Sequence, residues 1–478
     1  MIKRIFAFLL VLSAVSCTGG LYQEYSGCII YPDYMDVTVP SGIAPLNFDY
    51  TVPAEDNVTT FSFGDMQIRF KGSAVRWNAR KWRKLLQAAE GDDIQVTSTS
   101  PDTAWTIHVS EDDIDYGIAY RLLEPGYEVY SKMGIYEREL SSFRQRAILE
   151  NTEFNGCVNC HSVNRGDPSA LSLHIRGDHG ATILASPGKM EAYNTRTDTT
   201  KGFCVYPYWH PSGRYIAYST NDTRQVYHSK PDKLIEVCDL SSDVLIYDVE
   251  ANELKLSPSV RRTDRWETFP VFSADGVSVY FCSSAEHMPS DGVEDTRYNL
   301  YRASFDVATG AVGDSLEIVV DAESVGKSVS FPRPSYDGRF LVYTLSDYGQ
   351  FSIWHSEADL WILDLRTGES RVLAGTVSGE TESFHNWSSN SRWLVFSSRR
   401  DDGQFTRLYF SHVDESGNAS KAFMLPQKDP SRYYGTFFMS YNVPDFLTAP
   451  LRFDNVKASR LINAPGRTQF GVKFTGNK

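Results

Sequence analysis

The sequence predicts a mainly β protein whose larger part is a β-propeller, preceded by a small β-sandwich-like region. A hairpin pattern recurs four times, with equivalent positions at Pro207, Pro270, Pro332 and His385, which lie 63, 62 and 53 residues apart. Aromatic residues make up 13% of the chain, and such side chains pack well on a pleated sheet. Because single sheets of this kind cannot bury both faces alone, we expect them to stack around an axis. We expect six blades, within a range of five to eight.

The first 17 residues have the pattern of a lipoprotein signal peptide. A basic start at residues 1–4 precedes an apolar run at residues 5–15, which is too short to span a bilayer permanently. The small residues Ala14 and Ser16 before Cys17 resemble a bacterial lipobox, which implies a lipid on Cys17. An ordinary signal peptide that is cut nearby is the alternative. We therefore expect the protein in the cell envelope, in the periplasm or at the cell surface, held by its lipid in the outer membrane.

The middle of the chain divides into three predicted parts before the propeller. Residues 18–45 are a linker, and residues 46–114 form a small β-rich domain with period-two strands, for which we predict an immunoglobulin-like sandwich. A helix-like apolar spacing at Trp82, Leu85, Leu86 and Ala89 interrupts these strands. Residues 115–178 form a connecting segment, and residues 179–478 form the propeller.

The connecting segment carries Cys157-Val158-Asn159-Cys160-His161, the Cys-x-x-Cys-His pattern of covalent c-type haem attachment. Each thiol can add to one vinyl group of the porphyrin, and the imidazole of His161 can bind the iron as proximal ligand. We expect one covalent haem c. A disulfide between Cys157 and Cys160, or a zinc site that includes His161, is the alternative. For the sixth iron ligand, we consider His179 first and His174 second. Further candidates for that ligand are Met190, His210 and His228.

The repeats have a common local pattern: a strand, a turn and an alternating strand. The turns contain Ser212-Gly213, Asp275-Gly276 and Asp337-Gly338, where glycine supplies positive φ; the fourth turn lacks Asp-Gly. Residues 200–425 resemble TolB-type propeller repeats. The stretch from Tyr120 through His179 resembles exported Bacteroidetes proteins that carry a Cys-x-x-Cys-His motif before such a propeller. These proteins are often labelled cytochrome c biosynthesis or haem-binding proteins. The resemblance implies haem attachment at Cys157, Cys160 and His161.

Two blade-completing segments lie outside the visible repeats. Residues 180–193 are expected to supply strands of a preceding blade, and the tail from residue 433 to 474 to pair with it and close the ring. The remaining cysteines are expected in or beside strands as buried thiols, although Cys204 and Cys238 could bridge within a blade.

Composition narrows the function classes. The net charge of −13 argues against nucleic-acid binding, and no carboxylate pair stands out as a general acid and base, so the sequence does not indicate an enzyme. We expect electron transfer or haem-based redox sensing, with a protein redox partner or envelope complex docked on the propeller and the lipid in the membrane. The alternative is a propeller scaffold without haem that binds a protein or glycan partner, with Cys157 and Cys160 in a disulfide.

Overall fold

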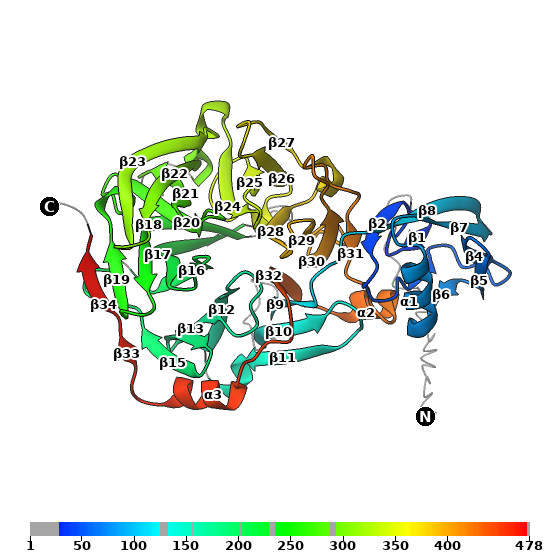
Figure 1. Ribbon diagram of the computed structural model, residues 1–478, viewed down its shortest axis with the longest axis horizontal. Helices are drawn as coiled ribbons and strands as arrows, with labels where there is room; N and C mark the ends of the chain where they lie inside the picture. Colours follow the sequence, from blue (N-terminus) through cyan, green and yellow to red (C-terminus); the bar gives the residue numbers. More distant parts are fainter. Residues whose placement is uncertain are drawn as a thin grey trace, which may run out of the picture.

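The computed structural model describes residues 28–124, 132–154, 156–200, 202–228, 235–286 and 293–475. Within these ranges the strands form eight sheets, six of which stand around a common axis as the blades of a propeller (Figure 1). The sequence prediction of a mainly β propeller with six blades is confirmed. The Cys17 lipidation site and the predicted signal peptide lie outside the described residues. Among the described residues, none of the helices has the length and apolar content needed to cross a membrane.

The blades follow one another along the chain (Figure 1). In blades two to six the first strand in the chain is the one next to the axis, whereas in blade one that strand is β32, from the end of the chain. Blade one contains β32 (Ser440–Leu447), β9 (Gly117–Leu123), β10 (Met133–Glu139) and β11 (Gln145–Glu150). Blade two contains β12 (Gly156–Val163), β13 (Leu171–Gly177), β14 (Ala181–Ser186), β15 (Lys189–Asn194) and β33 (Thr468–Gln469). Blade three contains β16 (Cys204–Trp209), β17 (Tyr215–Tyr227), β18 (Ile235–Asp248), β19 (Glu253–Leu256) and β34 (Gly471–Phe474).

The other three blades have four strands each. Blade four contains β20 (Arg265–Phe272), β21 (Ser278–Ala285), β22 (Asn299–Asp306) and β23 (Ala311–Val320). Blade five contains β24 (Ser328–Pro334), β25 (Phe340–Ser346), β26 (Asp359–Asp364) and β27 (Ser370–Val372). Blade six contains β28 (Glu382–Trp387), β29 (Trp393–Ser398), β30 (Arg407–His412) and β31 (Phe423–Met424).

The hairpin turns between first and second strands explain the recurring pattern. Gly213, Gly276 and Gly338 have φ values of 73°, 75° and 72°, the left-handed region that glycine enters without steric cost. In the fourth repeat, Ser391 occupies this region at φ 60°, so the turn keeps its shape without glycine. The missing Asp-Gly pair therefore does not change the blade.

The tail of the chain closes the ring. β32 is the axial strand of blade one and pairs with β9, which lies more than 300 residues earlier in the chain. β33 and β34 add parallel strands to the outer edges of blades two and three, next to β15 and β19. α3 (Asn455–Asn463) connects β32 to these edge strands, and Figure 1 shows the connection in red.

The propeller begins earlier than the sequence suggests. The segment predicted as a connection, residues 115–178, forms three of the four strands of blade one and the first two strands of blade two, so the predicted boundary at residue 179 falls inside a blade. Periodicity missed these strands because β10 and β13 are buried on nearly every residue and therefore lack alternation. Residues 181–194 supply two strands of blade two, as the sequence predicts. The tail does not close the ring on that blade as expected: β33 pairs with β15 only at the outer edge, and β32 closes the ring by pairing with β9 of blade one.

A small β-rich unit precedes the propeller. One sheet contains β1 (Ile30–Tyr31), β3 (Phe48–Tyr50) and β6 (Ala74–Val75). The other contains β2 (Val37–Pro40), β8 (Asp102–Ser110), β7 (Asp93–Thr99), β4 (Val58–Phe63) and β5 (Met66–Lys71). The predicted helix is α1 (Ala79–Ala88), which buries Trp82, Leu85 and Leu86 as its spacing indicates. β1 and β2 lie in the range that the sequence assigns to a linker.

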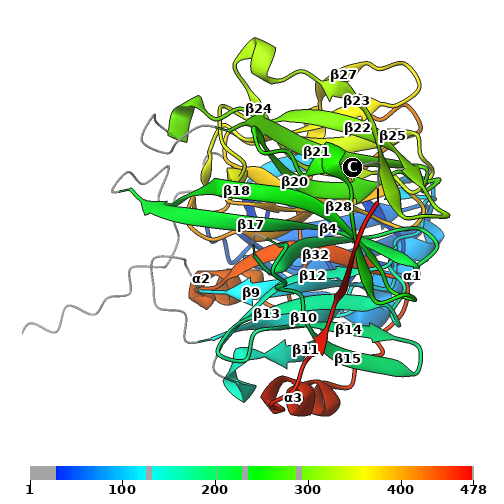
Figure 2. The same cartoon turned by 90° about the vertical axis from the view of Figure 1, so that its left-hand side faces the viewer.

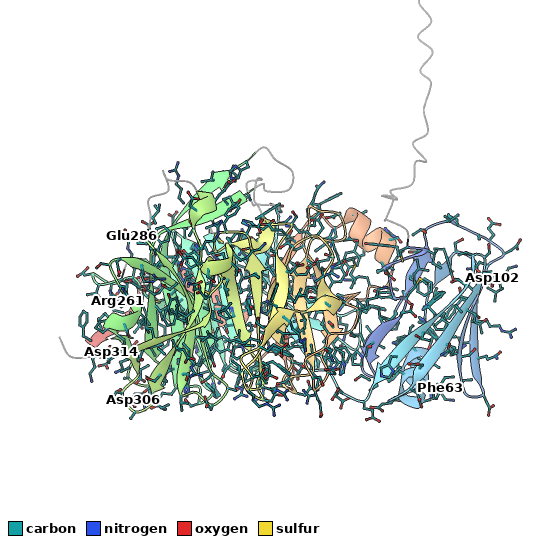
Figure 3. All side chains as sticks on the ribbon, turned by 90° about the horizontal axis from the view of Figure 1, so that it is seen from above. Phe63, Asp102, Arg261, Glu286, Asp306 and Asp314 are labelled. Carbon is teal, nitrogen blue, oxygen red and sulfur yellow. The ribbon has the colours of Figure 1, made fainter. Side chains whose placement is uncertain are left out.

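This unit packs against blade six, and a single hydrophobic core crosses the boundary. The Tyr31 hydroxyl donates to Asp401 at 3.1 Å, and the Asn47 amide donates to the Lys428 carbonyl at 2.9 Å. α2 (Pro430–Thr436) lies at the same junction. In the view from above, Phe63 and Asp102 mark the small unit at one end of the molecule, whereas Asp306 and Asp314 mark blade four at the other (Figure 3).

Candidate functional site

Each axial strand of the propeller contains the same backbone irregularity. The pairing register shifts within every one of these strands. One non-glycine residue in each strand has a φ between 44° and 52°. The six residues are Cys160, Tyr206, Phe269, Phe331, Phe384 and Val443. A left-handed backbone is costly for such side chains, and bulges of this kind aim side chains at functional centres. The irregularity therefore turns one side chain per blade toward the axis.

The Cys-x-x-Cys-His motif is one of these axial strands. It forms β12, with Cys160 at the left-handed position and His161 directly after it. In blades one, three, four and five the following residue is proline: Pro444, Pro207, Pro270 and Pro332. Blade six has His385 there. The haem motif is thus a further copy of the propeller repeat, which sequence reasoning placed outside the propeller.

A cavity of about 720 Å³ opens at one end of the axis, a size within the roughly 300–1,000 Å³ that is usual for cofactor sites. All six left-handed residues line it, together with Cys157 and His161. The aromatic rings at four of these positions form a chain of contacts, with centroid distances of 4.6 Å (Tyr206–Phe269), 4.2 Å (Phe269–Phe331) and 4.8 Å (Phe331–Phe384). The two smaller side chains are Val443 of blade one and Cys160 of blade two. At these two left-handed positions the side chain that lines the cavity is therefore not aromatic.

The two motif cysteines are free thiols on the wall of this cavity. Cys157 is half-buried, and the Arg121 guanidinium approaches its Sγ at 3.9 Å. Cys160 is buried, and burial raises the pKa of its thiol, an effect that the charge of Arg176 opposes. The structure thus brings both thiols to one cavity, as attachment to a single ligand requires.

His161 is buried, and neither of its ring nitrogens makes a hydrogen bond of ordinary geometry with any described residue. Burial and the positive charge of Arg121 lower its pKa to about 4, while the Ala119 backbone acts in the opposite direction. The imidazole is therefore neutral at physiological pH, the form that ligates metals. An unsatisfied imidazole is expensive to bury, so the site fits a bound group that would use its lone pair.

The structure does not bring the predicted sixth ligands to the cavity wall. His174 is buried in β13 with Nδ1 at 3.1 Å from the Thr182 hydroxyl, and burial lowers its pKa to about 3. His179 lies in the turn after β13, where its carbonyl accepts a hydrogen bond from Arg467 at 3.4 Å. Among the described residues that line the cavity, His161 is the one histidine, and no methionine accompanies it.

The three further candidates also lie elsewhere. His210 makes hydrogen bonds with both nitrogens, to the Ser212 hydroxyl at 2.8 Å and the Gly276 carbonyl at 3.0 Å. Met190 is buried in β15, the fourth strand of blade two, and His228 is exposed at the end of β17. Cys204 and Cys238, for which the sequence allowed a bridge, are both free thiols, and burial raises their pKa values to about 12 and about 11.

The cavity also contains residues that sequence reasoning missed. Four arginines line it: Arg121, Arg176, Arg333 and Arg399. The acidic residues on the same wall are Glu124 and Asp178. One sequence signal could have shown that the motif lies in a propeller blade. Cys160-His161 aligns with Phe384-His385 of the fourth visible repeat, and this alignment would have identified the motif as a further copy of that repeat.

Among the described residues, no group of three or more His, Cys, Asp or Glu side chains converges as a metal-ion site. Cys157, Cys160 and His161 line the same cavity but do not gather around a single point there. A structural zinc ion needs four closely spaced ligands. The described part of the chain therefore does not supply the four ligands that a zinc site at the motif would need.

One wall of the cavity is the hairpin of β17 and β18, which extends beyond the body of the propeller (Figure 2). On its other side, Glu236 of this hairpin accepts a hydrogen bond from Tyr348 at 2.7 Å and pairs with His355 at 3.0 Å. His355 also lies 3.2 Å from Glu357. Burial would lower the pKa of His355, but the two carboxylates raise it to about 9. The hairpin is thus held by a buried ion pair.

We expect the stabilisation from this pair to depend on pH. Because the pKa of His355 rises from 6.5 to about 9 on folding, its contribution is complete below pH 6.5 and is lost as the pH rises through about 9. The pKa of Glu236 is lowered, mainly by His355, so its contribution is lost only as the pH falls below 4.5. His355→Gln should therefore lower the free energy of unfolding by up to about 3 kcal/mol near neutral pH and by little above about pH 10. Chemical denaturation at a series of pH values measures this, and a pH-independent difference would contradict it.

Fold and site together define the class: a six-bladed propeller whose axial cavity is lined by two thiols and by an imidazole that makes no hydrogen bond of ordinary geometry with the described residues. No protein family matches the chain, and no curated protein does. Among solved structures, TolB from Acinetobacter baumannii is similar with a TM-score of 0.41 and 14% identity over 74% of this chain and 86% of that chain. The putative TolB from Agrobacterium tumefaciens has a TM-score of 0.39 and 15% identity over 69% of this chain and 99% of that chain. Because these scores are low, the propeller assignment rests on the sheets themselves.

Proposed function

We propose that this protein is an extracytoplasmic c-type haem protein, anchored through a lipid on Cys17, which transfers electrons or senses redox state. The observation that carries the proposal is that Cys157, Cys160 and His161 line one cavity, where the buried His161 ring makes no hydrogen bond of ordinary geometry with the described residues. The resemblance of the motif region to exported Bacteroidetes haem-binding proteins supports the same function.

Each motif residue has a role in this proposal. The Cys157 and Cys160 thiols would each add across one vinyl group, so that sulfur bonds to one vinyl carbon and the thiol hydrogen goes to the other. The neutral imidazole of His161 would hold the iron, and the nearby Ala119 backbone suits the other ring nitrogen. A bound haem c would supply a one-electron carrier.

The remaining residues of the cavity would tune and protect that carrier. The rings of Tyr206, Phe269, Phe331 and Phe384 close the axis on one side and would exclude water from the porphyrin. Exclusion of water shifts a haem potential and limits access to the iron. Because one haem carries one electron, a donor and an acceptor must each dock, and the propeller would provide the platform.

Covalent haem attachment is the direct test. The full chain is expressed with a cytochrome c maturation system, and the denatured protein is assayed by its reduced pyridine haemochrome spectrum. We expect about one haem per chain in the wild type and none in Cys157→Ala/Cys160→Ala, because both thioether links are lost. Cys28→Ala/Cys238→Ala is the matched control, since these free thiols lie outside the cavity wall, and it should keep its haem. A haem-free wild type beside a functioning control cytochrome would contradict the proposal.

The aromatic and cationic lining of the cavity favours a second candidate function. A propeller scaffold that binds a protein or glycan partner would use the same rings for stacking and the same arginines for charge. Cys157 and Cys160 would then form a disulfide. A thiol titration of the haem-free protein that finds these two cysteines oxidised would favour the scaffold over the cytochrome.

A further inference from the structure

The axial strands carry a second ring of side chains, which stand two residues after the six left-handed positions. One member of this ring is Val271, and the other five are polar: Ser162, Tyr208, Arg333, Asn386 and Asp445. All five polar members line a small cavity of about 20 Å³, which we call the axial chamber. A chamber of this size has room for about one water molecule. The propeller axis therefore carries a polar ring next to the mainly apolar ring of the large cavity.

His161 lies between the two spaces, because it lines both the large cavity and the axial chamber. Its side chain is 2% exposed, and neither ring nitrogen makes a hydrogen bond of ordinary geometry with any described residue. A neutral imidazole has one N–H donor and one acceptor nitrogen, and the partner of one nitrogen decides which of the two carries the hydrogen. A partner in the chamber would therefore determine what the ring presents to the large cavity.

Asp445 is the acidic member of the polar ring and is almost completely buried. Its Oδ2 accepts a hydrogen bond from the Val163 backbone N–H at 3.1 Å, and its Oδ1 accepts one from the Asn386 side chain. Burial raises the pKa of Asp445 to about 6, although the Arg333 charge and these two hydrogen bonds act in the opposite direction. At pH 8 the side chain is therefore a carboxylate, which only accepts hydrogen bonds.

Arg333 is the basic member of the same ring. Its Nη1 donates to the Pro332 carbonyl at 2.9 Å, and its guanidinium lies 5.5 Å from the centroid of the Tyr208 ring. A guanidinium only donates hydrogen bonds. A water molecule between an obligate donor and an obligate acceptor is held in one orientation, and buried waters usually make about three hydrogen bonds. The chamber thus offers a water two fixed partners and a place for a third.

We propose that a water molecule in the axial chamber joins the His161 ring to the Asp445 carboxylate, so that Asp445 positions the candidate iron ligand. The water would accept hydrogen bonds from Arg333 and from one N–H of His161, and it would donate one to Asp445. The other nitrogen of His161 then keeps its lone pair for the large cavity. This inference rests on the proposed function for the use of that lone pair, and it names the residue that fixes its direction.

The test reads the tautomer of His161 in the haem-free full chain. Nitrogen NMR of protein with labelled histidine, at pH 8, distinguishes a protonated from an unprotonated ring nitrogen, and the signals that disappear in His161→Leu identify this residue. We expect a single tautomer in the wild type. In Asp445→Asn the carboxamide can donate to the water, so we expect a mixture of tautomers or the opposite one.

The Ala119 backbone is the competing partner, since it raises the pKa of His161. It is unchanged in Asp445→Asn, so a single wild-type tautomer that persists in this variant would overturn the proposal and leave Ala119 as the group that holds the ring. A mixture of tautomers in the wild type would overturn it as well. A crystal structure of the wild type should show one water within hydrogen-bonding distance of Asp445 and His161, and a chamber without that water would overturn the proposal.

Two further variants separate positioning from general effects of charge and fold. Asp401 is another buried carboxylate whose pKa burial raises to about 6, and it accepts a hydrogen bond from Tyr31 away from both spaces. Asp401→Asn should therefore keep the wild-type tautomer of His161. If Asp445→Asn does not fold, Arg333→Gln replaces the obligate donor by a group that can also accept, so it should weaken the preference for one tautomer. An unchanged tautomer in Arg333→Gln would overturn the proposal.

The outcomes distinguish this inference from the proposed function. If the maturation system attaches haem but the tautomer of His161 does not respond to Asp445→Asn, the positioning role is overturned and the cytochrome stands. If the tautomer responds but no covalent haem forms, Asp445 still positions His161, and the proposed function is overturned.

Discussion

A chain that ends after Met439 is expected to lose cooperative folding. This truncation removes β32, the axial strand of blade one, which pairs with β9 and closes the ring. Tyr441, Phe446 and Leu447 of this strand are almost completely buried. Loss of one large buried side chain costs about 2–5 kcal/mol, so the loss of three approaches the roughly 5–15 kcal/mol of a whole domain. Thermal unfolding followed by circular dichroism would then show no sharp transition.

A second truncation provides the matched control. A chain that ends after Ala464 keeps β32 and α3 but lacks β33 and β34, which add only to the outer edges of blades two and three. Most of these edge residues are exposed. We expect this chain to unfold cooperatively at a moderately lower temperature. Equal behaviour of the two truncated chains would contradict the role of β32 as the closing strand.

Replacing His161 by leucine is expected to raise the stability of the haem-free protein, whereas the same change at His385 should lower it. The two histidines occupy equivalent positions in blades two and six. His385 Nε2 donates to the Val342 carbonyl at 2.9 Å, but His161 makes no hydrogen bond of ordinary geometry within the part of the chain that the structure describes. Removing an unsatisfied buried polar group is favourable, and orphaning a buried carbonyl costs about 1–3 kcal/mol. Urea denaturation of the two variants measures the difference directly.

In the haem-loaded protein, we expect the His161 substitution to change the haem spectrum and the His385 substitution to leave it unchanged. His161→Leu removes the proposed iron ligand, so we expect its Soret spectrum to change. His385→Leu leaves the cavity ligand in place, and its spectrum should match the wild type. A loss of stability in haem-free His161→Leu that equals the loss in His385→Leu would indicate that both histidines are merely structural.

The recurring hairpins were visible in the sequence because their turns require glycine. Gly213, Gly276 and Gly338 adopt the positive φ that the pattern predicts, and the blades they belong to follow in order. Blade one and half of blade two were missed. β10 and β13 have continuous runs of buried residues, so period-two alternation, the signal of a half-exposed strand, is absent from them.

The sequence showed the Cys-x-x-Cys-His motif, but it did not show where the motif lies in the fold. Cys157, Cys160 and His161 were identified from spacing, whereas their position at the axis depends on pairing between β12 and strands that follow it. The proposed sixth ligands were chosen because they lie near the motif in sequence. Nearness along a strand does not bring side chains together, since His174 lies across from Asn159 and packs against Phe203 rather than lining the cavity.

The sequence by itself determined the fold class, four of the blades and the three residues of the Cys-x-x-Cys-His motif, because turn chemistry and motif spacing are local properties. Only the tertiary structure decided that the motif is a propeller strand, that His161 is buried with no hydrogen bond of ordinary geometry to the described residues, and that Arg121 approaches the Cys157 thiol. Closure of the ring brings together strands from both ends of the propeller. The cavity forms where their side chains meet, and that meeting is encoded in packing across the whole chain rather than in any one segment.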